Sequence, residues 1–170
     1  MKKIVLVNGA ISGIIVSLFL VFSVGYCYAT SNFQGNMWVG YASMLLAFSL
    51  TFVGIKNFRD KQNEGVISFG KAFQIGLYIS LIASSFYVIT WLIDYYFFIP
   101  DFMEKFGGQA VESAKSSGAS ASEISKISTE IESYKEMYKT PLGVILLTYM
   151  EILPVGLVVS LISALILKKK

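Results

Sequence analysis

Four long apolar runs constrain the fold of this chain more than any other feature. They cover Ile4–Ala29, Met37–Ile55, Ile67–Ile99 and Leu142–Leu167. Each is long enough to cross the hydrocarbon core of a bilayer, which takes about 20 helical residues. Because 55% of the 170 residues are hydrophobic, a soluble core of this size cannot bury them all. The sequence therefore predicts an all-α integral membrane bundle of four transmembrane helices, with residues 1–170 as a single membrane domain.

The distribution of charge predicts the orientation. Nine Lys and Arg residues and two acids flank the apolar runs on one side, which gives that side a net charge of +7. On the other side, the short loop 30–36 has no charge, and the segment 100–141 carries five Lys and seven acids, or −2. Since basic loops stay on the cytoplasmic side, we expect a multi-pass protein with both termini in the cytoplasm.

The first apolar run has a second interpretation. Lys2 and Lys3 could form the basic region of a signal peptide, with cleavage after Cys27-Tyr28-Ala29. The run is longer than the usual apolar core of about 7–15 residues, which favours a retained span. Cys27 is the only cysteine, so no disulfide can form within the chain. We expect it to fill space near the end of the span, with lipidation or crosslinking as the alternative.

Composition also excludes several classes of site. The chain has no histidine and one cysteine, which removes the usual ligands of zinc, haem and iron–sulfur clusters. We expect no metal, no cofactor and no enzymatic activity. Since no basic stripe with interleaved aromatic residues occurs, we expect no binding of nucleic acid. The lipid bilayer is the expected surrounding.

The segment 100–141 predicts an amphipathic outer helical region between spans three and four. Ser120 and Glu123 fit a capping box, and apolar residues then recur at three- and four-residue steps over Ile124–Tyr138. We expect breaks at Gly107-Gly108 and at Ser116-Ser117-Gly118. The apolar stripe fits a cap on the bundle or on a short partner helix. Alternatively, it forms a docking surface for another protein.

Small residues recur every four positions within the spans, a pattern that lets helix backbones approach closely. We expect this pattern to pack the bundle within one chain, and the alternative is a homodimer formed through one stripe. The residues concerned are Gly9 and Gly13 in the first span, Gly76 and Ser80 in the third, and Gly156 and Ser160 in the fourth.

Glu151 is the most unusual polar residue of the spans. Counting back from Lys168 at 1.5 Å per residue places it about 6 Å inside the outer membrane boundary. A carboxylate at that depth should be protonated, paired or hydrated. Pro154 lies in the same turn and removes a backbone donor, which could kink the helix and open room for water or an ion.

Asp94 lies near the outer end of the third span. It follows Gly76 by 18 residues, or five helical turns, so it should share the face of the small residues. Asp94 and Glu151 could then occupy one layer and form a proton or cation site. Hydrogen-bonded packing and contact with a partner's basic residue are the alternatives.

Lys71 follows Ser68 at the cytoplasmic start of the third span. Snorkelling of its amine to the headgroups is the simplest expectation. A direct contact with a lipid phosphate at the helix N-terminus is the alternative.

Several stretches together form a recognisable pattern, namely Ile67–Phe73 with Gly76, Trp91–Tyr96 with Pro100–Phe102, Glu151–Leu157, Ser160–Leu165 and the terminal lysines. With these stretches the chain resembles the bacterial family catalogued as domain of unknown function 4199. The similarity covers nearly the whole chain and implies a four-span protein of the bacterial inner membrane, with no activity implied.

Two functions remain open from the sequence. The first is a small non-enzymatic membrane protein that assembles with itself or with a membrane complex, with the Ile124–Tyr138 helix as its contact for a partner. The alternative is a proton- or cation-coupled carrier or channel that uses Glu151 and Asp94 as an oligomer, because four spans are few for a carrier.

Overall fold

Four long helices form an elongated bundle in the computed structural model, which describes residues 1–33 and 37–169. They are α1 (Lys2–Thr30), α2 (Met37–Gln62), α3 (Phe69–Ile93) and α6 (Pro141–Leu167). Each is long and apolar enough to span a membrane, with α3 continuing to Phe98 as one apolar segment. The predicted all-α, four-span fold is confirmed.

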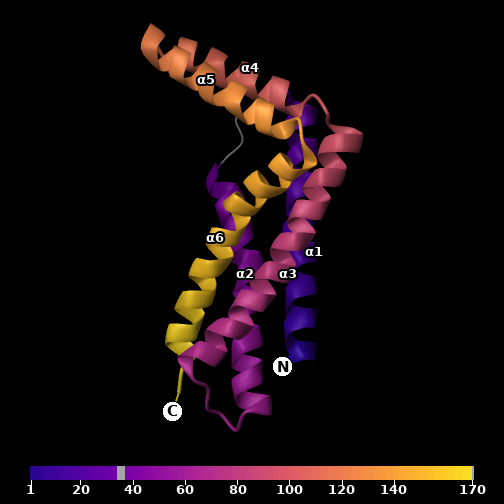
Figure 1. The fold of residues 1–170 in the computed structure, drawn as a ribbon, viewed down its shortest axis with the longest axis vertical. Coiled ribbons are helices and arrows are strands. Elements are labelled where there is room, and N and C mark those ends of the chain that lie inside the picture. The colour runs from indigo at the N-terminus through magenta and orange to yellow at the C-terminus, as the bar shows by residue number, and fades with distance from the viewer. Residues whose placement is uncertain (34–36, 170) are drawn as a thin grey trace.

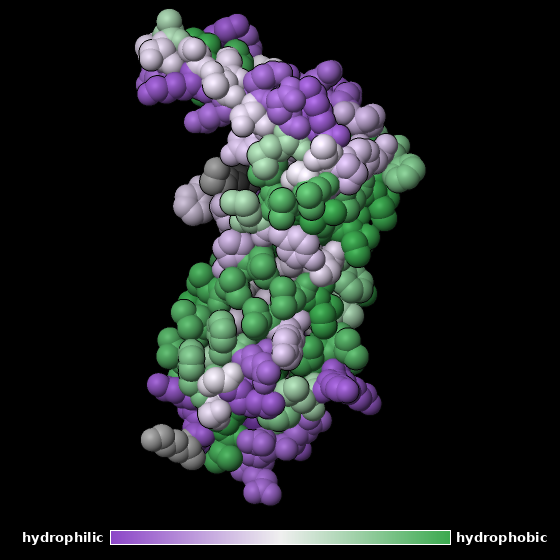
Figure 2. Space-filling model, viewed as in Figure 1, coloured by the Kyte–Doolittle hydropathy of each residue, from purple (hydrophilic) through white to green (hydrophobic). Residues whose placement is uncertain are grey.

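Two shorter helices, α4 (Phe102–Ser116) and α5 (Ala121–Tyr138), form a hairpin across one end of the bundle. Figure 1 shows this hairpin extending past the side of the bundle, with both chain termini at the opposite end. We call these the hairpin end and the termini end. Figure 2 shows hydrophobic side chains over the bundle and hydrophilic ones at both ends, as a membrane-spanning protein requires.

Helix ends follow local rules of capping. The Ser120 hydroxyl accepts a hydrogen bond from the Glu123 backbone, and the Glu123 carboxylate accepts one from the Ser120 backbone. The predicted capping box is therefore confirmed. Gly118, with φ of 78°, ends α4 in a backbone conformation that favours glycine. Thr140 caps α6, and Pro141 occupies its first turn.

The expected break at Gly107-Gly108 is wrong. Both residues lie inside α4. A Cβ atom on Gly107 would lie 2.5 Å from Cγ2 of Ile131, so glycine there allows α4 and α5 to pack closely. The break occurs earlier instead, at residues 99–101, after the π-helical turn η1 (Asp94–Phe98) in which α3 ends. A pair of glycines permits either a turn or a close contact between helices. At Gly107 the structure has the close contact.

The helices are arranged so that α1 and α6 each pack against both α2 and α3. Gly9 and Gly13 of α1 face Ile82 and Phe86 of α3, where an added Cβ would come within 2.8 and 2.7 Å. On the other side of α3, small residues from α3 and α6 interlock. A Cβ on Gly76 would lie 2.8 Å from the Ser160 Cβ, and one on Gly156 would lie 2.8 Å from the Ser80 Cβ.

The hairpin is attached to the bundle through the hairpin end of α1. The Tyr28 hydroxyl donates to Asp101 Oδ1 at 2.5 Å, and Lys105 Nζ lies 2.7 Å from Asp101 Oδ2. The Lys105 amine also lies 4.3 Å from the centre of the Tyr28 ring. The Phe102 ring meets the Trp91 ring edge-on at 5.0 Å. These contacts fix α4 over α1 and α3.

Candidate functional site

The site is built around Glu151, which lies on α6 within the apolar part of the bundle. Its side chain is exposed at the bundle surface. The hydroxyl of Tyr87, a buried residue of α3, lies near the Glu151 carboxylate and interacts with it. The carboxylate therefore has a donor on its inner side and an open surface on the other. A carboxylate in an apolar span is costly, which makes this arrangement a candidate site.

Tyr138, a residue of the hairpin, lies near the Glu151 carboxylate. It ends α5, and its hydroxyl oxygen accepts a hydrogen bond from Trp91 Nε1 at 3.2 Å. Burial raises the pKa of Tyr138, and the nearby Glu151 carboxylate raises it further, whereas the bond from Trp91 lowers it. Thr148, one turn from Glu151, lies close to the same tyrosine, and its own hydroxyl donates to the Val144 carbonyl at 2.7 Å. We call Tyr87, Trp91, Tyr138, Thr148 and Glu151 the carboxylate cluster.

This cluster holds neutral donors around one acid. A tyrosine or indole donor lowers the cost of a carboxylate without adding charge. Such a set can hold a proton, orient the acid toward a partner, or bind a small cation with help from another chain. Within residues 1–33 and 37–169, no three His, Cys, Asp or Glu side chains gather as a metal site would require.

Asp94 does not lie beside Glu151 as we expected. It stands at the start of η1, seven residues beyond Tyr87 along α3, which is about 10 Å further toward the hairpin end. Among the described residues, its Oδ2 atom is buried and has no hydrogen-bond partner. The expectation of one shared layer fails because Glu151 is level with Tyr87, whose long side chain crosses to it.

Pro154 lies inside α6, which continues unbroken from Pro141 to Leu167. Its ring is exposed and faces away from the buried residues Ile152 and Gly156. Glu151 is exposed on the same face of α6 as Pro154 and Val158, which follow it by three and seven residues.

Lys71 lies at the termini end of α3, one turn from the Ser68 cap. Its backbone N–H donates to Ser68 Oγ at 3.3 Å, and its amine donates to Gln74 Oε1 at 3.3 Å. With Lys169 it lines a shallow depression of about 470 Å³. Lys169 and Ile67, which also line the depression, pair through two backbone hydrogen bonds of 2.9 Å. Contact of Lys71 with a lipid headgroup stays a prediction.

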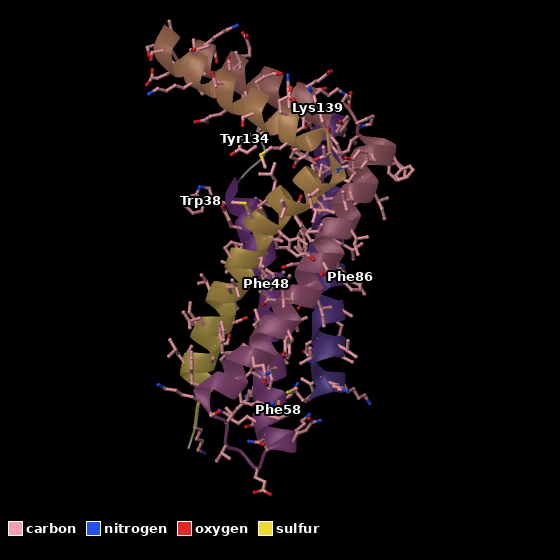
Figure 3. The ribbon with its side chains drawn as sticks, in the orientation of Figure 1. Trp38, Phe48, Phe58, Phe86, Tyr134 and Lys139 are labelled. Carbon is pink, nitrogen blue, oxygen red and sulfur yellow. The ribbon has the colours of Figure 1, made fainter. Side chains whose placement is uncertain are left out.

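The apolar stripe of the Ile124–Tyr138 helix faces mainly α4. Ile131 is buried against Gly107, and Tyr138 enters the carboxylate cluster. Tyr134 is 47% exposed, so part of the stripe remains open. In Figure 3, Tyr134 lies under the hairpin, on the side where Trp38 projects from α2.

The sequence places Tyr138 in the apolar stripe of the outer helix and Trp91 in a stretch that carries the family resemblance, and it assigns neither residue to a site. Thr148 was not singled out. Their common position next to Glu151 follows from the return of α5 onto the bundle, which pattern alone does not indicate. Each of these side chains joins an apolar body to a single polar atom, and this amphipathic character is the signal in the sequence that could have indicated a buried polar cluster.

Comparison with known proteins gives one match. Residues 8–169 match the family model described as "Protein of unknown function (DUF4199)". No curated protein and no solved structure matches the chain.

Proposed function

Since the chain belongs to the DUF4199 family of proteins of unknown function, we propose a role from its own carboxylate cluster. The chain is a non-enzymatic membrane protein that assembles with a second membrane-embedded chain. The contact is made by the half of α6 that lies nearer the hairpin end. The partner is another copy or a subunit of a membrane complex. The observation that carries this proposal is an exposed carboxylate, Glu151, on an otherwise apolar helix surface.

The chemistry of the partner follows from the open side of Glu151. Tyr87 satisfies the carboxylate from within the bundle, and its neighbour Met150 is 72% exposed. Lipid chains cannot donate hydrogen bonds, so a lipid-facing carboxylate is unfavourable. A helix that presents a Lys, Arg, Asn or Gln side chain at this depth would remove that cost. Such interhelical hydrogen bonds contribute about 1 kcal/mol in membranes.

The hairpin supplies a second surface on the same protein. Tyr134 and Met137 of the Ile124–Tyr138 helix are 47% and 38% exposed, although the rest of that stripe packs on α4. The segment 100–141, which contains the hairpin, has a net charge of −2. An external segment of the partner, placed under the hairpin, would contact Tyr134 while its span contacts Glu151.

The proposed location is the bacterial inner membrane with both termini in the cytoplasm. The net charge of +7 around the termini end supports this orientation through the positive-inside rule. Both termini lie at that end of the bundle, as an even number of spans requires.

The test is crosslinking in the native membrane followed by mass spectrometry of the gently extracted protein. A photoreactive residue at Met150 should give a discrete adduct, and the same residue at Ile166, which is 64% exposed near the other end of α6, should not. Glu151→Leu should abolish the adduct, and the mapped contact should be a basic or amide side chain. Adducts with lipid alone at Met150 would contradict the proposal.

The contact between Glu151 and the buried residue Tyr87 favours a second function. The protein could act as a proton- or cation-coupled carrier or channel, with Glu151 and Asp94 as its ion-binding acids in an oligomer. The unpartnered Asp94 oxygen supports the inclusion of that residue. In this case Glu151→Gln should abolish flux in liposomes, and an unchanged flux would contradict it.

A further inference from the structure

Hydroxyl side chains are unusually frequent in the centre of the bundle. Most of them have partners: Ser12 donates to the Ala47 carbonyl at 2.8 Å, and Ser160 donates to the Gly156 carbonyl at 2.7 Å. The fully or almost fully buried hydroxyl residues are Ser12, Thr51, Ser80, Ser84, Thr148, Ser160 and Ser163.

Two of these hydroxyls have no partner among the described residues. Thr51 Oγ1 and Ser84 Oγ are both buried without a hydrogen bond, and both residues are 0% exposed. An unsatisfied buried hydroxyl costs about 1–3 kcal/mol. Such groups in proteins are normally satisfied by an internal water, which needs polar neighbours within reach. The structure offers those neighbours.

The first of these hydroxyls without a partner in the described part of the chain, that of Ser84, lies on α3. Ser84 stands one turn from Ser80, so their Cβ atoms lie about 5–6 Å apart, and Tyr87 follows three residues further along the same helix. One water with hydrogen bonds of about 2.8 Å on each side spans that distance. Ser80 Oγ is in turn 3.0 Å from Ser160 Oγ and 3.1 Å from the Gly156 carbonyl. The polar groups therefore continue from Tyr87 to Ser160.

Thr51 continues the same line from α2. A Cβ atom on Gly76 would lie 3.0 Å from Thr51 Cγ2 and 2.8 Å from Ser160 Cβ, so Thr51 and Ser160 flank the same glycine. We call Tyr87, Ser84, Ser80, Ser160 and Thr51 the hydroxyl file. It contains residues of α2, α3 and α6, and it leads from Glu151 toward the middle of the bundle.

Apolar side chains close the file on the side of the termini. The Cδ1 atom of Ile79 comes within 2.6 Å of a Cβ built on Gly54, one turn beyond Thr51. The buried Asn8 side chain also lies beside Gly54, with its amide carbon 3.4 Å from that Cβ, and its Nδ2 group donates to the Ile4 carbonyl at 2.8 Å. From there to the termini end the centre is filled by an apolar cluster. Its buried members are Val5, Ile55, Phe58, Ile67, Ala72, Ile75, Ile79, Ala164 and Leu167.

We infer that Thr51 and Ser84 bind internal waters, which extend the Tyr87–Glu151 pair into a proton-access path from the hairpin half of the bundle to its middle. Protons would pass by exchange of hydrogen bonds between water and hydroxyl groups, each oxygen accepting one proton and releasing another. The apolar cluster blocks the second half, so the resting protein does not leak. This inference rests on the second proposed function, ion coupling at Glu151.

Detection of the waters is the first test. In isotope-labelled wild-type protein in bilayers, magnetisation transfer from water should reach the backbone amides of Ser84 and Thr51 but not that of Ile55, which is also fully buried. Ser84→Ala should remove the transfer at position 84. Absence of transfer at both hydroxyl residues in the wild-type protein would overturn the inference, and this result needs no variant to fold.

A proton leak is the second test. In liposomes with a pH-sensitive dye inside, Ile79→Ser should raise proton entry about tenfold or more, because a polar group in a hydrophobic constriction admits water. The double variant Ile79→Ser/Ser84→Ala should return to the wild-type rate. The control Ile162→Ser, 50% exposed on α6, should not leak. An equal leak from the single and double variants would overturn the path.

The tests also separate this inference from the ion coupling on which it rests. A dry file together with a flux that Glu151→Gln abolishes would reject the path and leave ion coupling standing. A hydrated file with a flux that Glu151→Gln leaves unchanged would reject ion coupling at Glu151.

Discussion

Tyr87, a buried residue of α3, brings its hydroxyl next to Glu151, an exposed residue of α6. This contact joins the interior of the bundle to its surface at a depth where the surrounding helices are apolar. Nearer the hairpin, Trp91 Nε1 donates to the Tyr138 hydroxyl at 3.2 Å. Tyr138, which ends α5, also lies near the Glu151 carboxylate, so the hairpin and the bundle core meet at the same acid.

The coupling between Tyr87 and Glu151 can be measured. Tyr87→Phe and Glu151→Gln should each lower the free energy of unfolding, and the double variant should cost less than their sum by about 1 kcal/mol. Equilibrium unfolding in mixed micelles gives these values. Tyr26→Phe, which alters a tyrosine that is 60% exposed, should show no coupling to Glu151→Gln. Additive effects for Tyr87 would contradict this contact.

The α3–α6 interface should not tolerate a side chain at Gly156. Gly156→Val would place a Cβ 2.8 Å from the Ser80 Cβ and 2.9 Å from the Phe48 ring, and overpacking of this kind costs about 1–3 kcal/mol. Gly25→Val is the matched control, because nothing lies within 4 Å of a Cβ at that glycine. Thermal melting of both variants in the same detergent checks the difference. Equal melting temperatures would be inconsistent with this packing.

Attachment of the hairpin should weaken in acid. The Lys105 amine and the Tyr28 hydroxyl hold the pKa of Asp101 below its usual range. Since the folded pKa is lowered, this stabilisation is full above the unfolded carboxyl pKa of about 3.9 and is lost as pH falls through the folded value.

Hydrogen exchange of the α4 amides between pH 6 and pH 3, corrected for intrinsic rates, would measure this effect. Protection should fall below about pH 4 in the wild-type protein. Asp101→Asn should lower protection at pH 6 and flatten its dependence on pH, whereas Glu112→Gln, at an exposed carboxylate of the same helix, should resemble the wild type. A pH dependence that persists in Asp101→Asn would assign it to another group.

Orientation in the membrane is open to a direct test in a Cys27→Ser background. Ser128→Cys on the hairpin should react with an impermeant maleimide in intact spheroplasts. Gln62→Cys, at the termini end of α2, should react only after lysis. The expectation follows from the +7 charge at that end, and the opposite labelling pattern would reverse the topology.

Lys71 should contribute to binding of anionic phospholipid. Its amine lies in the depression with Lys169, close to the first turn of α3. Native mass spectrometry should show less retained anionic lipid in Lys71→Gln than in the wild type. Lys61→Gln is the control, because Lys61 does not line the depression. Equal losses in both variants would indicate general charge attraction only.

Much of the fold was predictable because membrane spans obey simple rules. Apolar length predicted the four long helices, and the Ser120–Glu123 pattern predicted the start of α5. Both signals are local, since each depends on residues within one helix. The Gly107-Gly108 pair shows the limit. The same two residues suit a turn or a close helix contact, and only the position of Ile131 selects between them.

The sequence by itself determined that the chain forms four apolar helices, with an acid at Glu151 too costly to be left without a partner. Only the tertiary structure decided that this partner is Tyr87 and not Asp94, and that Tyr138 returns from the hairpin to the same place. The physical reason is that burial and charge set the cost of a group from its local surroundings. Its partners depend on how separate helices rotate and cross, which small residues such as Gly76 and Gly156 control through packing.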